Sequence, residues 1–255
     1  MAAVERARRG QVEVLTLNRP EARNAVNGDV SAEMEAALDA AEADDDVGAV
    51  IVTGAGDVFC AGADLKAIAS GNARAIETER GSFAGFVARD FAKPRIAAVN
   101  GAAVAGGFEI VLACDLVVAA ETAVFGLPEV TRGLFAAAGG PFRLARRVPL
   151  ATATEIVLTG DPIDAPRAHA LGLVNQVVPR DQVVDAAVAL AERIAANAPV
   201  AVRCSLRMLR EAPDLPEPDA WRRSGELAGE VFRSEDAREG PRAFAEKRPP
   251  RWTGR

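Results

Sequence analysis

The sequence predicts an α/β fold in which strand, glycine-rich turn and helix recur along the chain. Three observations carry this prediction. Apolar runs of strand length recur, two of them lead into glycine-rich turns, and most segments between them are compatible with helices. Runs of this kind are buried on both faces, and the loops that follow them collect at one end of the strands. We therefore expect one large core with a smaller appendage.

The elements are expected in a regular order, beginning with a strand over residues 12–17. An Asn18-Arg19-Pro20 turn follows it. Asn27 is the expected N-cap of a helix near 28–43, because an asparagine side chain accepts from a free N–H of the first turn. Further buried strands are expected at 49–53, 96–99 and 116–120.

One long segment lacks a clear period. Residues 66–92 are polar and mixed, compatible with helix but without a repeating apolar stripe. We interpret this segment as a mobile flap over a site, because long irregular connections in compact proteins usually carry function.

The chain changes character from about residue 180. Helices are expected at 181–196, 199–211 and 218–233, with a proline-rich break, APDLPEP, before the last of them. The sequence therefore divides into a core over residues 1–195 and a helical C-terminal region over residues 196–255.

Composition excludes several classes of protein. The net charge of −6 argues against broad nucleic-acid binding, although a local basic patch can still serve a phosphorylated ligand. No apolar run reaches membrane-spanning length, and the N-terminus lacks the apolar stretch of a secretory signal. We expect a cytoplasmic protein that binds neither membrane nor nucleic acid.

Cysteine and histidine usage argues against a metal centre. Cys60, Cys114 and Cys204 are far apart and form no C-x-x-C pair, so they predict buried thiols rather than a disulfide framework or a zinc site. His169 is the single histidine and lies in an alanine-rich helical stretch. A Ser-His-Asp triad is therefore not indicated, and we interpret His169 as structural.

Two glycine-rich segments carry the chemistry, FCAGADLK at 59–66 and NGAAVAGGFEIVLACD at 100–115. Gly106 and Gly107 permit two interpretations: close packing of strand on helix, or free N–H groups at a helix start that favour an anionic oxygen. Two converging backbone donors stabilise an oxyanion, and each is worth ~100- to 1000-fold in rate. Neither segment has the spacing of a dinucleotide site or a phosphate loop.

Two carboxylates accompany these segments. Glu109 follows Gly106 in the first turn of an apolar helix, and Glu129 follows Pro128 in an apolar segment. Glu109 as a helix-dipole partner and Glu129 as a cap are the structural alternatives. Burial would raise the pKa of either carboxyl toward the range that suits general acid–base catalysis.

Other charged residues have simpler interpretations. Asp64 precedes a short helix and is a candidate N-cap, and Lys66 is expected on a solvated helix surface unless a phosphate lies nearby. We expect Arg143, Arg146 and Arg147 to form a solvated helix face without a role in the site.

In combination, these motifs resemble the enoyl-CoA hydratase/isomerase family, the crotonases, over essentially the full chain. The matching segments are LNRPEARNAV at 17–26, TGAGDVFCAGADLK at 53–66, NGAAVAGGFEIVLACDLVVAA at 100–120, FGLPEV at 125–130, LTGDPIDAPRAHALGLVNQVVP at 158–179 and the terminal EGPRAFAEKRPPRW. The resemblance implies a spiral of strand–strand–helix repeats. It also implies that the C-terminal region mediates trimerisation, commonly with two trimers forming a hexamer.

The resemblance assigns roles residue by residue. Ala63 and Gly106 fall on the two backbone donors of an oxyanion hole for the thioester oxygen. Glu109 and Glu129 fall on the two carboxylates of hydratases. In that scheme Glu109 activates the water that attacks Cβ, and protonated Glu129 delivers a proton to Cα.

The resemblance also implies where CoA binds. The pantetheine and nucleotide portions would lie along residues 61–66, and Phe244 and Lys247 match a terminal element that meets CoA from a neighbouring subunit. The implied substrate-binding residues are Ala61, Ala63, Asp64, Leu65, Lys66, Gly106, Phe244 and Lys247. CoA is part of the substrate, so no separate cofactor is implied.

We therefore expect reversible hydration of a trans-2-enoyl-CoA to a 3-hydroxyacyl-CoA, in the degradation of fatty acids or related acyl groups. Residues 135–140 read FAAAGG where hydratases often have Pro-Gly before the Gly-Gly, a change that can reshape the acyl pocket. The alternatives are an enoyl-CoA isomerase, a carnitinyl-CoA-type dehydratase, whose terminal sequence looks similar, and a binding protein that uses the fold as a scaffold.

Overall fold

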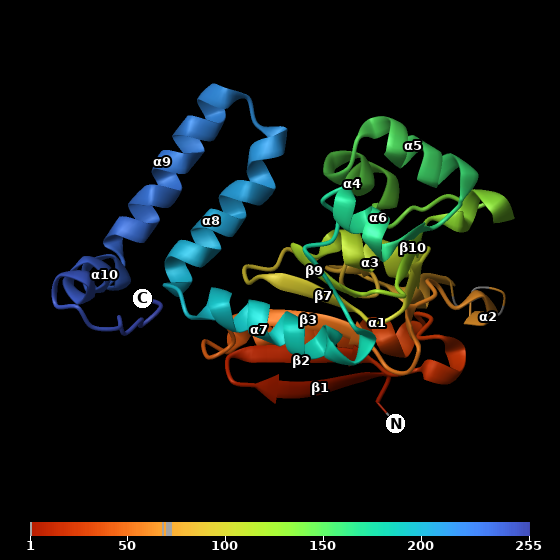
Figure 1. Cartoon of the computed structure of the whole chain (residues 1–255), viewed down its shortest axis with the longest axis horizontal. Coiled ribbons are helices and arrows are strands. Elements are labelled where there is room, and N and C mark those ends of the chain that lie inside the picture. The colour runs from red at the N-terminus through yellow and green to blue at the C-terminus, as the bar shows by residue number, and fades with distance from the viewer. Residues whose placement is uncertain (1, 68, 70–72) are drawn as a thin grey trace.

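The computed structural model describes residues 2–67, 69 and 73–255, which form a layered body of sheets and helices with a helical arm (Figure 1). The strands are β1 (Val4–Arg9), β2 (Val12–Leu17), β3 (Ala49–Gly54), β4 (Val58–Cys60), β5 (Glu77–Thr78), β6 (Ser82–Phe83), β7 (Arg95–Val99), β8 (Ala102–Val104), β9 (Leu116–Ala120), β10 (Val124–Gly126), β11 (Ile163–Asp164) and β12 (Gln176–Val178). The α-helices are α1 (Gly28–Ala43), α2 (Leu65–Ala67), α3 (Gly106–Ala113), α4 (Gly140–Arg147), α5 (Leu150–Thr159), α6 (Ala165–Ala170), α7 (Val183–Ala195), α8 (Pro199–Glu211), α9 (Glu217–Arg233) and α10 (Asp236–Ala245).

The body contains a large sheet and a smaller one. The large sheet has the order β1-β2-β3-β7-β9-β12, with β1 antiparallel to β2 and the remaining neighbours parallel. The smaller sheet has the order β11-β10-β8-β4, in which β10, β8 and β4 run parallel. The expected apolar runs are β3, β7 and β9. They lie inside the large sheet, where both faces are covered, so near-continuous apolar sequence is required.

A repeated unit connects the two sheets. Each of β3, β7 and β9 is followed along the chain by a strand of the smaller sheet, β4, β8 and β10, and then by a helical segment, α2, α3 or the 3₁₀ helix η4 (Pro128–Arg132). The predicted strand–strand–helix repeat is therefore confirmed. Because β4, β8 and β10 are adjacent and parallel, the segments that follow them meet at one edge of the smaller sheet.

Helix α1 shows how local sequence sets an element's boundary. The Asn27 side chain accepts a hydrogen bond from the Val30 N–H at 3.1 Å, as predicted for an N-cap. At the other end of the helix, the buried Lys93 ammonium donates to the carbonyls of Ala41 and Asp44 at 2.8 and 2.6 Å. These carbonyls have no partner within the helix, so the ammonium supplies their hydrogen bonds. Its positive charge also interacts favourably with the negative end of the helix dipole.

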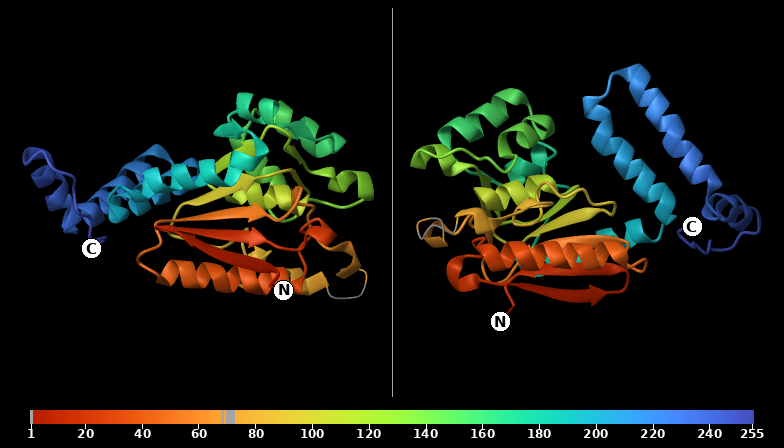
Figure 2. Two further views of the ribbon diagram at one scale, coloured as in Figure 1. Left: turned by 60° about the horizontal axis from the view of Figure 1, so that its bottom comes forward. Right: turned by 180° about the vertical axis from the view of Figure 1, so that it is seen from behind.

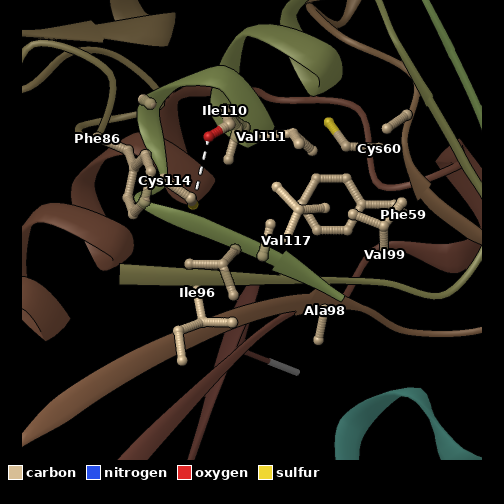
Figure 3. Close-up of a cluster of buried hydrophobic side chains, with 14 of the residues drawn as sticks. Phe59, Cys60, Phe86, Ile96, Ala98, Val99, Ile110, Val111, Cys114 and Val117 are labelled. Atoms are coloured by element: carbon tan, nitrogen blue, oxygen red, sulfur yellow. Dashed lines mark hydrogen bonds between the residues drawn. The ribbon is translucent and has the colours of Figure 1, made fainter. Parts of the chain in front are cut away.

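The core lies between α3 and the two sheets (Figure 3). Ile110, Val111 and Cys114 from the α3 segment pack toward residues of β7 and β9 such as Ile96 and Val117. The Cys114 thiol donates to the Ile110 carbonyl, and burial raises its pKa to about 12. The three cysteines are buried free thiols, as expected. Because α3 is buried along its whole length, its first turn, with Gly106 and Glu109, is held in one place.

The segment expected to be a flap is largely part of this core. Residues 68 and 70–72 lie outside the described chain. In the remainder, Phe83, Phe86, Val87 and Phe91 are all buried, and the Ser31 hydroxyl donates to the Ile76 carbonyl at 2.7 Å. The buried phenylalanines are spaced too irregularly to signal a helix or a strand, so this packing was not apparent from sequence.

Helices α8, α9 and α10 extend from the body as an arm, with α8 and α9 antiparallel (Figures 1 and 2). Val200, Cys204 and Leu227 form a small apolar cluster inside the pair. Arg210 on α8 binds the Asp115 carboxylate through two hydrogen bonds of 2.9 and 2.7 Å, which fixes the arm to the second residue after α3. The division of the chain at residue 195 remains a prediction. In the described part of the chain, no helix has the length and apolar character needed to cross a membrane.

Candidate active site

The candidate site lies where three loops meet at the edge of the smaller sheet. The segment 61–66 follows β4, Gly106 begins α3 after β8, and Glu129 lies in η4 after β10. Parallel pairing brings Cys60 opposite Ala103, and Gly126 opposite Val104, so the three strands end side by side. The topology thus gathers residues that are up to 68 positions apart in the sequence.

The first backbone donor candidate is Ala63, which forms an isolated parallel bridge with Val26. The Val26 N–H donates to the Gly62 carbonyl at 2.8 Å, and the Asp64 N–H donates to the Val26 carbonyl at 2.9 Å. In a parallel bridge of this pattern, the residue between the two bonded groups directs its own N–H to the opposite side. The Ala63 N–H therefore faces away from Val26.

The second candidate, Gly106, starts α3 directly against the first loop. Ala105 precedes it with a φ of 52°, and the Ala105 carbonyl accepts from the Phe108 and Glu109 N–H groups, so the Gly106 N–H is one of the free donors of the helix start. A Cβ on Gly62 would lie 3.0 Å from the Gly106 nitrogen, and one on Gly106 would collide with the Phe83 ring. Both glycines are required because the two loops and this ring are in close contact.

Glu109 is a buried carboxyl on the inner face of α3, with only 3% of its surface exposed. Its Oε1 accepts a hydrogen bond from the Gly140 N–H at 2.8 Å. Burial is the largest cause that raises the pKa of Glu109, and the nearby Glu129 charge adds to it. The Gly140 and Ala138 N–H groups and Arg143 lower the pKa, and the net result is a pKa of about 7. The carboxyl can therefore gain or lose a proton near neutral pH.

Glu129 is the second carboxyl of the site and lies in the first turn of η4. Its Oε2 is buried and has no hydrogen-bond partner among the described residues. Burial raises the pKa of Glu129, opposed by its own backbone N–H and by Arg132. An unsatisfied buried carboxyl oxygen is costly, so its persistence indicates a group held for a ligand or for proton transfer.

The segment 61–66 forms the outer wall of the site. The Asp64 carboxylate accepts from the Lys66 and Ala67 N–H groups at the start of α2 and pairs with Arg19 at 3.0 Å. These hydrogen bonds and Arg19 lower the pKa of Asp64 against the opposing effect of burial. The predicted capping role of Asp64 is thus confirmed. Leu65 and Lys66 point outward and are exposed.

Phe244 and Lys247 are not brought to these residues. They lie at the end of α10, at the far end of the arm from α2 in both figures (Figures 1 and 2). Phe244 is 87% exposed. Within one chain they can therefore take no part in the site formed by the three loops.

Sequence reasoning missed three residues that contact the site. Gly140 donates to Glu109, Phe83 rests on Gly106, and Arg143 binds the turn before Gly140. The Arg143, Arg146 and Arg147 cluster was expected to be solvated, but Arg143 and Arg147 are partly buried and donate to backbone carbonyls. Gly139-Gly140-Pro141 marks a helix start in the sequence, yet nothing in its spacing indicates a contact with Glu109.

Two further features lie apart from the site. The His169 ring Nδ1 lies 2.8 Å from the Val174 carbonyl, which fits its predicted structural role. A shallow cavity of about 610 Å³ is lined by strand ends and α7, including Thr53, Asn100 and Arg180. The side chains of these three residues donate hydrogen bonds to backbone carbonyls. Clusters of histidine, cysteine and acidic residues suited to a metal ion are not found among the described residues.

The chain is similar to known proteins over essentially its full length. A family model described as enoyl-CoA hydratase/isomerase matches residues 7–255. An enoyl-CoA hydratase of Mycobacterium tuberculosis is 42% identical over 97% of this chain and 95% of its own length. A carnitinyl-CoA dehydratase of Proteus mirabilis is also 42% identical, over 97% of each chain. The crystal structure of an enoyl-CoA hydratase from M. tuberculosis superposes with a TM-score of 0.96 at 45% identity and full coverage of both chains.

Proposed function

Because the chain belongs to the enoyl-CoA hydratase/isomerase family, we propose that it is a hydro-lyase that adds water reversibly to a trans-2-enoyl-CoA, giving a 3-hydroxyacyl-CoA. The observation that carries this proposal is a pair of carboxyls, the buried Glu109 and the half-buried Glu129, whose pKa values are both raised, beside the free N–H groups at the start of α3. Water addition needs a base and an acid at adjacent carbons, which two such groups supply.

The reaction follows from the positions of these groups. The Glu109 carboxylate removes a proton from water as its oxygen attacks Cβ of the substrate. Electron density then moves through Cα to the thioester oxygen, where the Ala63 and Gly106 N–H groups stabilise the negative charge. Protonated Glu129 donates its proton to Cα, and the thioester carbonyl re-forms. One water is consumed, and the transferred protons leave Glu109 protonated and Glu129 ionised until solvent exchange restores them.

The two carboxyls are suited to opposite protonation states. The charge of Glu129 opposes ionisation of Glu109, so the pair is most stable with one proton between them. The Gly140 and Ala138 N–H groups stabilise the ionised form of Glu109, whereas the Glu129 Oε2 has no such donor among the described residues. These contacts support Glu109 as the base and Glu129 as the acid.

Recognition of CoA is proposed along residues 61–66, with Lys66 near the nucleotide phosphates. In the proposed assembly, Phe244 and Lys247 reach this region from a neighbouring subunit. Their position at the far end of the arm supports contact with another chain rather than with their own site. The scheme needs no cofactor besides the CoA of the substrate, and we place the enzyme in the cytoplasm.

A carnitinyl-CoA-type dehydratase is a specific second candidate. The curated relatives include a carnitinyl-CoA dehydratase as similar as the enoyl-CoA hydratase, both at 42% identity. A solved carnitinyl-CoA hydratase from Mycobacterium avium is 50% identical with a TM-score of 0.78. The chemistry is the same addition or elimination of water, so the two candidates differ in the acyl group and not in the catalytic residues.

The deciding experiment is a panel of 2-enoyl-CoA thioesters of different chain length, together with crotonobetainyl-CoA. Hydration removes the conjugated-thioester absorbance, which gives kcat/KM for each substrate. We expect activity with at least one 2-enoyl-CoA. If the protein moves the double bond of a 3-enoyl-CoA rapidly but hydrates nothing in the panel, the isomerase alternative replaces this proposal. Specific RNA retardation at physiological salt, without any turnover, would instead favour the binding-protein alternative.

A further inference from the structure

Arg143, on α4, connects two segments that each touch the candidate site. One guanidinium nitrogen donates to the Ala138 carbonyl at 3.0 Å, and the other donates to the Val87 carbonyl at 2.6 Å. Ala138 lies in the turn that leads to Gly140, the donor to Glu109. The guanidinium also packs on Gly139, where an added Cβ would collide with it. Arg143 therefore covers this turn and also forms a hydrogen bond to Val87, which is distant in the sequence.

The second segment leads to the proposed oxyanion donor. The Val87 N–H donates to the Phe83 carbonyl at 3.2 Å, which makes residues 83–87 a helical turn. The Phe83 ring lies against the Cα of Gly106, so a shift of this turn would move the ring or the glycine. Continuous contacts thus run from Arg143 to both Glu109 and Gly106.

We propose that Arg143 is a positioning residue for the hydration step, which holds the Gly140 N–H on Glu109 and the Phe83 ring on Gly106 by bonding both supporting turns at once. The inference rests on the proposed function, because it assigns Arg143 an effect on that reaction. Arginine suits the role, since its planar fork carries donors in fixed directions that reach two carbonyls together. Lysine carries the same charge but lacks this geometry.

The charge of Arg143 also acts on the Glu109 carboxyl. Arg143 is the cation that lowers the pKa of Glu109, while burial and Glu129 raise it and the Gly140 and Ala138 N–H groups lower it. Burial and the neighbouring arginines, Arg95, Arg146 and Arg147, in turn lower the pKa of Arg143, whereas Glu109 raises it. Loss of the guanidinium therefore shifts the ionisation of Glu109 to higher pH.

The test compares Arg143→Lys, Arg143→Gln and the control Arg147→Gln in the full-length protein. Arg147 is a partly buried arginine on the same helix, and its guanidinium donates to the Cys114 carbonyl at the other end of α3. For each protein the readouts are kcat and KM over pH, the melting temperature, and the titration of Glu109 by carboxyl ¹³C NMR, assigned with Glu109→Gln.

We expect Arg143→Gln to lower kcat by ~10- to 100-fold with a smaller change in KM, because sub-ångström displacement of catalytic groups acts on the chemical step. The acid limb of its kcat–pH profile and the Glu109 titration should both move to higher pH. Arg143→Lys should restore the pH profile but not kcat, and guanidinium added below denaturing concentrations should partly rescue Arg143→Gln. Arg147→Gln should lower the melting temperature without either kinetic change.

Two results would overturn the proposal. One is an Arg143→Gln enzyme with wild-type kcat and an unmoved acid limb. The other is an equal loss in Arg147→Gln, which would make the effect one of stability. If the wild-type protein hydrates no substrate, the proposed function fails, and the NMR titration still decides whether Arg143 controls the ionisation of Glu109.

Discussion

At the scale of single residues, the site depends on the burial of a carboxyl group whose charged form is more stable in water. Glu109 lies on a fully buried helix, and its raised pKa is a direct result of that burial. Among the described residues, backbone N–H groups and the partly buried Arg143 lower its pKa. Such a carboxyl destabilises the fold while it serves the reaction, which is a common cost of an active site.

The first prediction tests this cost through pH. Because the folded-state pKa of Glu109, about 7, exceeds its ordinary value of 4.5, the folded form binds the proton more tightly than the unfolded form. The associated stability is fully present below pH 4.5 and is lost as pH rises to about 7. Glu109→Gln should therefore raise the free energy of unfolding at pH 8 by roughly 1–3 kcal/mol, and the gain should vanish near pH 4, as measured by urea denaturation.

The control is Glu230→Gln, which removes a carboxylate from a partly exposed ion pair on the arm. This substitution should change stability by less than about 0.5 kcal/mol at either pH. A Glu109→Gln protein that is less stable at pH 8 than at pH 4, relative to wild type, would contradict the raised pKa.

The second prediction separates the roles of the two carboxyls. Glu109→Gln and Glu129→Gln should each lower hydration by ~100- to 10,000-fold, because an amide neither accepts nor donates the required proton. Deuterium exchange at Cα of a saturated acyl-CoA needs one base and the oxyanion hole but no attacking water. Glu129→Gln should abolish this exchange, and Glu109→Gln should retain part of it. Loss of exchange in Glu109→Gln alone would reverse the assignment.

At the scale of elements, the starts of two helices each supply a backbone N–H group to the site. Gly106 presents a free N–H at the start of α3, and Gly140 at the start of α4 donates to Glu109. Both positions use the donors that a helix leaves unpaired at its N-terminus. Both also require glycine because a neighbouring side chain, Phe83 for Gly106 and Leu127 for Gly140, lies directly against the Cα.

The third prediction follows from the space around Gly140. A Cβ there would lie 2.9 Å from Leu127 Cδ1 and 3.0 Å from Glu109 Oε1. Gly140→Ala should therefore displace the carboxyl and lower kcat by ~100-fold. Gly10→Ala is the control: its φ of 57° strains an alanine, but its Cβ would meet no atom within 4 Å. It should cost about 1 kcal/mol of stability and no activity. Equal activity in both variants would contradict the proposed contact.

At the scale of the whole molecule, the arm exposes apolar surface that the body does not cover. Leu209, Trp221, Phe232 and Phe244 are all more than 70% exposed. Large exposed aromatic residues on one appendage are typical of an interface between subunits. The salt bridge between Arg210 and Asp115 attaches this appendage to the end of α3, so the arm has a fixed position relative to the site.

The fourth prediction concerns assembly and CoA binding. The full-length protein should be a trimer or hexamer by light scattering, and deletion of residues 234–255 should weaken both assembly and CoA affinity. Removing the charges of Lys66 and Lys247 should lower CoA affinity at low salt more than at high salt, because exposed charges are screened. A full-length monomer with unchanged CoA affinity in the lysine variants would contradict both expectations.

The sequence by itself determined the buried strands, the N-cap of α1 and the candidates Gly106, Glu109 and Glu129. These follow from local signals: apolar runs, a capping residue, and glycines or acids beside an apolar helix. Ala63 became a candidate only through the family resemblance of the motifs. The tertiary structure alone showed that residues 83–91 enter the core and that Arg143 and Gly140 support the site. The reason is physical, since a carbonyl 56 residues away binds Arg143, and no local pattern records such a contact.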